Sequence, residues 1–316
     1  GPWIPEVLSL AGSGIVSPVR RLALGMNFVI NRPIIPACAA GLTSPGTADR
    51  KNRLLFFAPW RGRTIAGTYY RFHHGGAADM KVTDEDIALF LADLNRAYPP
   101  ARLEKKDIAV IHAGLLPTDS TVGEPEPRRY YRIVDHAATD GIEGLLTVAG
   151  IKFTTARDVA VRTADECLRK LGSTVAVLDG GSARTRLPGG DIPDFRRFAE
   201  EADRVDGREF GAETVRRLVL NYGTHYKKVL ELCRENTDLK RPVGGSPDLI
   251  GAEVVHAIRS EMAQTLADVA MRRTDLGSAG KPDEKTLECC ADIIGREAGW
   301  DQRRKESELA NCSLDH

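Results

Sequence analysis

Gly150, Lys152, Thr154 and Thr155 lie within the stretch AGIKFTT, and their types suit contact with an anionic or electron-rich ligand. The run LLTV before them is typical of a strand, and the residues after Thr155 are typical of a helix. The positive end of that helix points at the turn, and Lys152 adds a full charge, so the turn favours a ligand that gains negative charge. A plain strand-to-helix turn with a surface lysine is the alternative interpretation.

The helix after this turn is predicted from its cap and its apolar spacing. Thr155 as N-cap with Asp158 three residues on predicts a capping box, and Gly172 is the expected stop. The predicted buried stripe of this helix comprises Val159, Cys167, Leu168 and Leu171. The turn is therefore expected at the start of a helix that packs against other parts of the protein.

The elements on either side divide the chain near residue 185. Short apolar or β-branched runs predict strands in the first part, with one helix capped by Thr83 and Asp86. These runs are MNFVIN, RLLFFAPW, RTIAGTYYRF, IAVIHAG, YYRIVDH and LLTVAG. The second part is almost wholly helical in pattern, and its apolar spacing predicts a helix across residues 251–273 with Met262 on the buried stripe.

These patterns predict an α+β fold in two domains. Residues 1–184 are expected to form a mixed, largely antiparallel sheet with one helix over it. Residues 185–316 are expected to form a C-terminal all-helical domain of about four or five helices, after a linker rich in glycine and proline.

Composition excludes several classes of function. Lysine plus arginine equals aspartate plus glutamate at 44 each, so nucleic acid is not an expected partner. No apolar run approaches the roughly 18 residues of a membrane span, and no secretory leader pattern is present. The six cysteines form no CxxC pair, so neither a metal site nor a disulfide framework is expected. We expect a cytoplasmic protein.

Several stretches resemble FAD-dependent glycerol-3-phosphate dehydrogenases, which belong to the D-amino-acid-oxidase-like flavoproteins. LLTVAGIKFTTARDVAVRTADECL is similar to the family form LLTVxGGKLTTYRxxAExxxD, and FFAPWRGRTIAGTYY is similar to FFxPWxGxTxIGTTD. GPWIPEVL and IAVIHAGLLPTDS resemble TGPWxDxV and VxxxxAGLRPL, and three helical segments resemble the family's carboxy-terminal domain. These segments are LNYGTHYKKVLEL, IGAEVVHAIRSEMAQTLADVAMRRTDLG and IIGREAGWDQRRKESE. The matches follow the family's order, so together they are more specific than any single motif.

The resemblance implies an activity and a set of site residues, and it implies that residues 1–184 are the substrate-binding, flavin-facing part of an FAD-dependent oxidoreductase domain. Enzymes of this family pass a hydride from C2 of sn-glycerol 3-phosphate to N5 of FAD, form dihydroxyacetone phosphate, and deliver electrons to quinone or another acceptor. By this resemblance Lys152 would stabilise charge on the flavin, and Arg128 and Thr68 would bind a small phosphorylated polyol. The implied cofactor-binding residues are Gly150, Ile151, Lys152, Thr154 and Thr155. Peripheral attachment to the inner face of a membrane is a further family expectation.

The family's glycine-rich GxGxxG turn, which holds the FAD pyrophosphate, does not occur in this sequence; AGSGIVSP is the nearest stretch. We therefore expect a fragment of a longer protein or one product of a split gene, with a possible second chain carrying the nucleotide-binding region. In that case this chain alone is expected to be inactive and to bind FAD only when the missing region is supplied. Apolar surface on the LLTVAG strand and on the following helix is then expected to be exposed.

Departures from the family pattern weaken the substrate assignment. Asn27 stands where the family has a histidine that is a candidate base, and an amide accepts no proton at neutral pH. Leu116 replaces the arginine of AGLRP, and Tyr69 and Tyr70 replace the last two residues of GTTD. Losing one charged contact to phosphate costs on the order of 1.5 to 3 kcal/mol.

Two assignments and two functions stay open. Arg129 beside Arg128 leaves the arginine register open by one residue, and a surface arginine is the alternative for Arg128. His112 is expected in the core or on a sheet face, with a catalytic base as the alternative interpretation, while the pair at residues 73–74 fits a polar turn better than a metal site. The second function is a non-catalytic relative that acts as a binding or interaction module.

Overall fold

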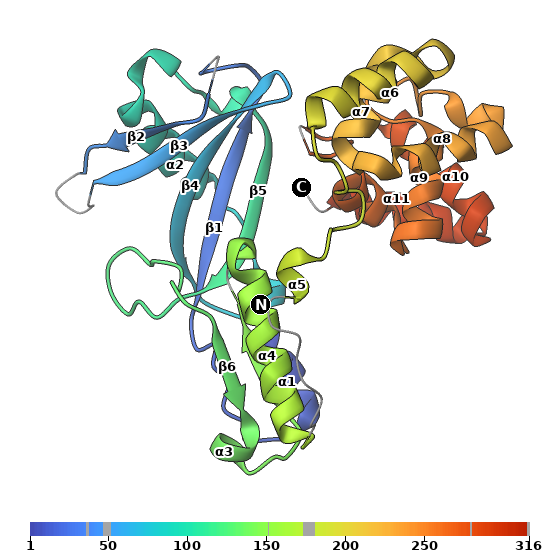
Figure 1. The fold of residues 1–316 in the computed structure, drawn as a ribbon. Helices are drawn as coiled ribbons and strands as arrows, with labels where there is room; N and C mark the ends of the chain where they lie inside the picture. Colours follow the sequence, from blue (N-terminus) through green and yellow to red (C-terminus); the bar gives the residue numbers. More distant parts are fainter. Residues whose placement is uncertain (36–37, 47–51, 151, 173–180, 279, 315–316) are drawn as a thin grey trace. The chain divides into compact units, whose positions relative to one another are not determined.

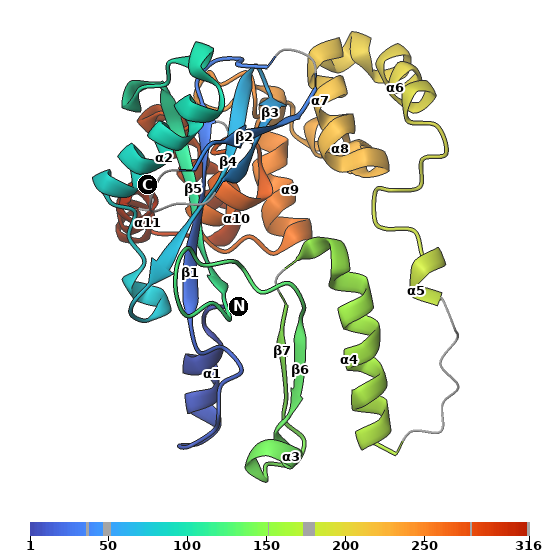
Figure 2. The ribbon, with the colours of Figure 1, turned by 90° about the vertical axis from the view of Figure 1, so that its left-hand side faces the viewer.

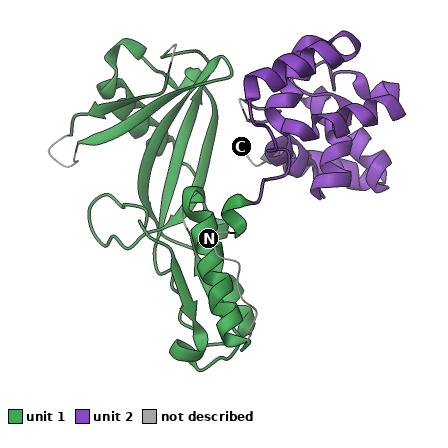
Figure 3. Cartoon of the chain, in the orientation of Figure 1, with its two compact units in different colours: residues 1–184 green, residues 185–316 purple. Residues whose placement is uncertain are grey.

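The computed structural model describes residues 1–35, 38–46, 52–150, 152–172, 181–278 and 280–314. The chain divides into two compact units, Gly1–Arg184 and Thr185–His316 (Figure 3). The first unit contains a β-sheet and the second is helical, so the predicted α+β class is confirmed.

Five strands of the first unit form one sheet in the order β2-β3-β4-β1-β5, and every described pairing is antiparallel (Figure 1). Their bounds are β1 Leu22–Ile30, β2 Ala40–Ser44, β3 Arg53–Trp60, β4 Arg63–His73 and β5 Ile108–Pro117. The strand β2 was not predicted from the sequence. Its sequence AGLTS is short and opens with small residues, so it gives a weak strand signal.

One face of this sheet is buried by helix α2, Asp84–Ala97. The predicted capping box is present, because Thr83 Oγ1 accepts a hydrogen bond from Asp86 N and an Asp86 carboxylate oxygen accepts one from Thr83 N. Phe90 of the helix lies 4.6 Å, centroid to centroid, from the ring of Phe28 and 5.7 Å from that of Tyr69. Side chains that alternate along each strand therefore point either to α2 or to the reverse face.

The remainder of the first unit surrounds a two-stranded antiparallel ribbon (Figure 2). Its elements are α1 Ile4–Ala11, β6 Arg132–Asp135, α3 His136–Asp140, β7 Leu146–Ala149, α4 Ala156–Lys170 and α5 Gly181–Arg184. Lys170 Nζ lies 2.7 Å from a carboxylate oxygen of Asp135, which ties the end of α4 to β6. Ala149, the last residue of β7, is fully buried beside the sheet, so β7 brings the chain from α3 to the sheet just before the turn that precedes α4.

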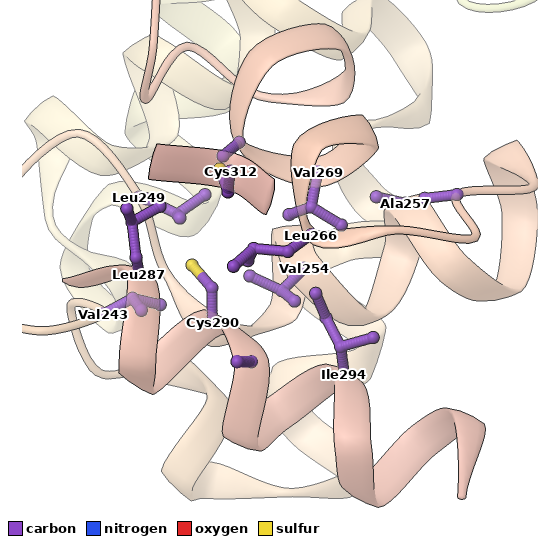
Figure 4. Packing of buried hydrophobic residues seen from close by; sticks show 13 residues of the cluster. Val243, Leu249, Val254, Ala257, Leu266, Val269, Leu287, Cys290, Ile294 and Cys312 are labelled. Atoms are coloured by element: carbon purple, nitrogen blue, oxygen red, sulfur yellow. The ribbon is translucent and has the colours of Figure 1, made fainter. Parts of the chain in front are cut away.

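The second unit is built from helices around two apolar clusters, one of which is shown in Figure 4. The helices are α6 Phe195–Phe210, α7 Ala212–Tyr222, α8 Tyr226–Glu235, α9 Gly251–Glu261, α10 Glu284–Ala298 and α11 Gln302–Leu314, with a π-helix at Asp268–Arg273. Short 3-10 turns lie at Ala77–Asp79, Pro99–Ala101, Lys105–Asp107, Phe153–Thr155, Gly223–His225 and Thr237–Lys240.

The prediction of one helix across residues 251–273 was wrong. The helix α9 stops at Glu261, because Met262 adopts a left-handed conformation with φ of 60° and its side chain is 80% exposed. Leu266 and Val269 are still fully buried, after the chain has turned. Their apolar spacing therefore predicted correctly that these residues are buried, but it predicted wrongly that one helix is unbroken across them.

Candidate functional site

The turn that carries Lys152 borders a hollow of about 670 Å³ between β7 and α4. Val148 of β7 and Phe153 line the hollow on the side of the turn, and the opposite wall is a helix face of small side chains. That face comprises Ala156, Val159, Ala160, Thr163, Ala164 and Cys167. Lys152 is thus the cation of a largely apolar, open hollow whose size suits a flat ring system.

Exposure is high throughout this turn. Gly150, Lys152, Thr154 and Thr155 are exposed, and the Phe153 side chain is 99% exposed. Ile151, which the resemblance assigned to cofactor binding, lies outside the described residues. An aromatic ring in water beside a cationic turn marks a surface that suits an interaction.

The predicted capping box of α4 was wrong. Thr155 Oγ1 donates to Lys152 O at 3.1 Å within the preceding 3-10 turn, and no side chain caps the helix. Asp158 accepts instead from Arg162 and from the Tyr131 hydroxyl, and these bonds lower the pKa of its carboxyl. The first amides of α4 consequently keep no side-chain partner at the N-cap position.

The predicted buried stripe of α4 was also largely wrong in this chain. Val159 is buried, but Cys167 is exposed and Leu171 is 79% exposed. The apolar residues have helical spacing, but the described residues do not pack against most of this side of α4. The exposed apolar surface expected on this helix is therefore present.

Asn27 and Thr68 lie at a β-bulge on the reverse face of the sheet. Met26 pairs with Tyr69 and Asn27 pairs with Gly67, so Thr68 is the extra residue in β4. The Asn27 amide lies over Gly67, where an added methyl group would overlap Asn27 Oδ1. Bulges redirect side chains and occur often beside active sites, so the predicted role of these two residues in ligand contact stays a prediction that the bulge supports.

Two further features of this face were missed in the sequence. His112 of β5 is the direct cross-strand partner of Asn27 and is exposed, so an imidazole stands beside the amide. Tyr70 and Leu116 meet over Gly25: a methyl group on Gly25 would lie 3.0 Å from Tyr70 Cε1 and 3.3 Å from Leu116 Cδ1. Only the strand register reveals these neighbours.

Arg128 is 6% exposed and is held by Asp119. Its Nε and Nη2 donate to the two carboxylate oxygens at 3.0 and 2.8 Å, and Nη2 also donates to Pro18 O at 3.0 Å. Its buried Nη1 has no hydrogen-bond partner among the described residues. Arg129 is exposed near Glu126, so the buried arginine of the pair is Arg128.

The described part of the chain contains no cluster of three or more His, Cys, Asp or Glu side chains arranged to hold a metal ion. The His73 ring nitrogen Nε2 is 2.9 Å from Gly76 O within its turn. Among the same residues, no helix combines the length and the apolar character needed to cross a bilayer.

Comparisons with known proteins identify the class of protein to which the chain is similar. Residues 181–305 match the family described as the C-terminal domain of alpha-glycerophosphate oxidase. The sheet unit and the helical unit together resemble a solved glycerol-3-phosphate dehydrogenase from Bacillus halodurans in complex with FAD. That likeness has a TM-score of 0.78 at 24% identity and covers 100% of this chain and 60% of the other.

Particular relatives agree with this class. A glycerol-3-phosphate dehydrogenase from Synechocystis is 27% identical over 98% of this chain and 56% of its own length. An aerobic glycerol-3-phosphate dehydrogenase from Staphylococcus epidermidis is 26% identical over 87% and 48%, and the mitochondrial mouse enzyme is 27% identical over 99% and 42%. The predicted resemblance to glycerol-3-phosphate dehydrogenases is confirmed. The chain spans about half the length of these curated relatives.

Proposed function

We propose that this chain forms the substrate-facing and helical parts of an FAD-dependent oxidoreductase related to glycerol-3-phosphate dehydrogenases. The observation that carries the proposal is the set of exposed residues Gly150 and 152–155, which includes Lys152 and leads into the start of α4 at an apolar hollow. A cation and the positive end of a helix at such a hollow stabilise negative charge on an electron-rich ring.

The residues of this turn fit one end of FAD. The small side chains of α4 leave room for a flat ring, and Lys152 complements the charge that a flavin gains on reduction. The pyrophosphate end has no such counterpart, since the 316 residues contain no GxGxxG turn. We propose that polypeptide outside these residues, in the same protein or in a second chain, supplies it.

When bound, FAD would supply the acceptor for a hydride from the substrate carbon. The residues of this chain then have separate roles: Lys152 stabilises charge, while Asn27 and Thr68 orient the substrate hydroxyl from the bulge. Oxidation at a secondary alcohol is the proposed reaction, with quinone or another acceptor taking the electrons. The helical unit has no assigned chemical step.

A second function is favoured by one specific observation. The position of the family's candidate base holds Asn27, whose amide packs over Gly67 and accepts no proton at neutral pH. A non-catalytic binding module would tolerate this residue. His112, directly opposite Asn27, offers the proton acceptor that the enzyme function needs, so the enzyme is the preferred proposal.

Co-expression with the amino-terminal half of the Synechocystis relative tests the proposal. We expect the purified pair to retain FAD, seen by its visible absorbance and by the protein-bound stoichiometry. Lys152→Met is expected to weaken retention of reduced FAD more than oxidised FAD, whereas Lys105→Met, at an exposed ion pair on another element, leaves both unchanged. Phe153→Ser is expected to weaken assembly of the two halves. Failure of the pair to hold any flavin would refute the enzyme function.

A further inference from the structure

The reverse face of the sheet, opposite α2, is almost free of charge. The strand register places neutral side chains along it: Leu54, Phe56 and Ala58 on β3; Ile65, Gly67, Tyr70 and Phe72 on β4; Ala23, Gly25, Asn27 and Val29 on β1; and Val110, His112, Gly114 and Leu116 on β5. Within these strands the register adds one permanent cation, Arg63, beside the β3–β4 turn. Seven residues separate it from Tyr70, which corresponds to about 20 Å along a strand.

Tyr70 and Leu116 form a wall on this face. They reach over β1 from the two neighbouring strands, and Gly25 leaves the room that both side chains occupy. Gly114, the cross-strand partner of Gly25, has open space above it, since a methyl group there would have no neighbour within 4 Å. The wall therefore borders open space on this face, which His112 and Asn27 flank one row further along the same strands.

A phosphate group fits this part of the face poorly. Neither Leu116 nor the Tyr70 ring carries a charge, and one phenol hydroxyl donates a single hydrogen bond. Arg128 directs two of its three nitrogens to Asp119. Removing a dianion from water and placing it against an apolar wall costs more free energy than these contacts supply. Removing an apolar group from water is favourable.

We infer that the substrate is an uncharged secondary alcohol whose apolar alkyl or aryl substituent packs on the wall formed by Tyr70 and Leu116. The substituent takes the place that phosphate has in glycerol 3-phosphate. This inference rests on the proposed function, because it names the substrate class of the same site. Tyr70 and Leu116 are the residues that determine specificity.

Binding to the full 316-residue chain tests the inference without any flavin. The probes are 3-phenoxypropane-1,2-diol and sn-glycerol 3-phosphate, which share the diol and differ in the third substituent. Titration followed by ligand-observed NMR is expected to give the phenoxy diol a Kd at least about tenfold lower, the factor that one lost charged contact represents. A lower Kd for glycerol 3-phosphate, equal Kd values, or no binding of the phenoxy diol would overturn the inference.

Paired variants make the test specific. Tyr70→Asp/Leu116→Arg restores a charged pair beside Gly25 and is expected to reverse the preference, while Tyr70→Phe keeps the wall and the preference. Leu54→Arg adds a cation to the same face on β3 and is the matched control, with no reversal expected. Circular dichroism checks that each variant is folded; if the double variant unfolds, Leu116→Gln must still weaken binding of the phenoxy diol. Flavin retention by the co-expressed pair is scored separately, so either proposal can fail without the other.

Discussion

Arg128 either stabilises the fold through its ion pair with Asp119 or is available to bind a ligand at the predicted substrate site. The substitution of Asp119 distinguishes these two roles. Asp119→Asn removes the negative charge and one strong acceptor. The Arg128 guanidinium is 6% exposed and would keep its hydrogen bond to the Pro18 carbonyl. Arg128 Nη1 already lacks a partner among the described residues. We therefore expect the substitution to destabilise the sheet unit.

The magnitude follows from the two bonds and from solvent exposure. Two hydrogen bonds between charged groups contribute about 1.5 to 3 kcal/mol each when buried. The Asp119 side chain is 55% exposed, so water replaces part of each contact and screens the charge. We expect the free energy of unfolding to fall by roughly 2 kcal/mol, below the 3 to 5 kcal/mol for breaking a fully buried pair.

Urea unfolding followed by tryptophan fluorescence measures this change. In a Trp300→Phe background the remaining tryptophans, Trp3 and Trp60, lie in the first unit, so the signal reports that unit. The matched control is Glu126→Gln, at the exposed ion pair with Arg129, where we expect a change within about 0.5 kcal/mol.

The pH dependence adds an independent check. The Arg128 guanidinium lowers the pKa of the Asp119 carboxyl below its usual 3.8. Because the folded pKa lies below the unfolded one, this contribution is present above about pH 4 and is lost as the pH falls further. The Asp119→Asn variant should lack that loss. An unchanged free energy of unfolding at pH 7 would refute the reasoning and would leave Arg128 available to a ligand.

Three further predictions concern other positions. Glu253→Gln should destabilise the helical unit by about 3 to 5 kcal/mol in thermal unfolding, because it leaves the Arg217 guanidinium without its charged partner; Arg217 Nη1 lies 2.7 Å from the buried carboxylate. If the Glu253→Gln/Arg217→Met double variant lost as much stability as the two single variants added together, the prediction would be contradicted. Gly67→Ala should displace the Asn27 amide, seen as a shifted Asn27 side-chain NMR signal; an unmoved signal would refute the contact. Burial raises the pKa of the Cys290 thiol to about 12, so this thiol should resist alkylation at pH 8 in the native state, and stability should fall above about pH 9 as the unfolded thiol ionises first; rapid native labelling would exclude it.

The sequence predicted those elements whose ends are determined by residues close to them in the chain. The Thr83 cap of α2 was correct because its hydrogen bonds lie within one turn. The break at Met262 was not predicted, because apolar spacing continues on both sides of it and a left-handed methionine carries no local signal. The Thr155 cap failed for a related reason, since a 3-10 turn competes for the same hydroxyl.

The site was only partly accessible from the sequence. The turn Gly150–Thr155 was visible as a stretch of chain, because all its residues are consecutive. The neighbours of Asn27 were not visible, since they depend on the bulge at Thr68 and on the register with His112. A shift of one residue in either pairing would place different side chains beside Asn27, and such a shift cannot be read from one strand alone.

The packing of Tyr70 and Leu116 over Gly25 bears on the choice between an altered enzyme and a module that has lost its ligand. In the family pattern these two positions hold an aspartate and an arginine, and in this chain both are uncharged. Loss of one charge alone would leave the other without a partner beside Gly25, which is unfavourable at a half-buried position. Replacement of both by side chains that pack over the same glycine, within about 3.3 Å of a methyl position, keeps that glycine covered beside the open space at Gly114. A neutral, apolar wall beside an imidazole and an amide therefore favours our proposal of a different substrate over the loss of one.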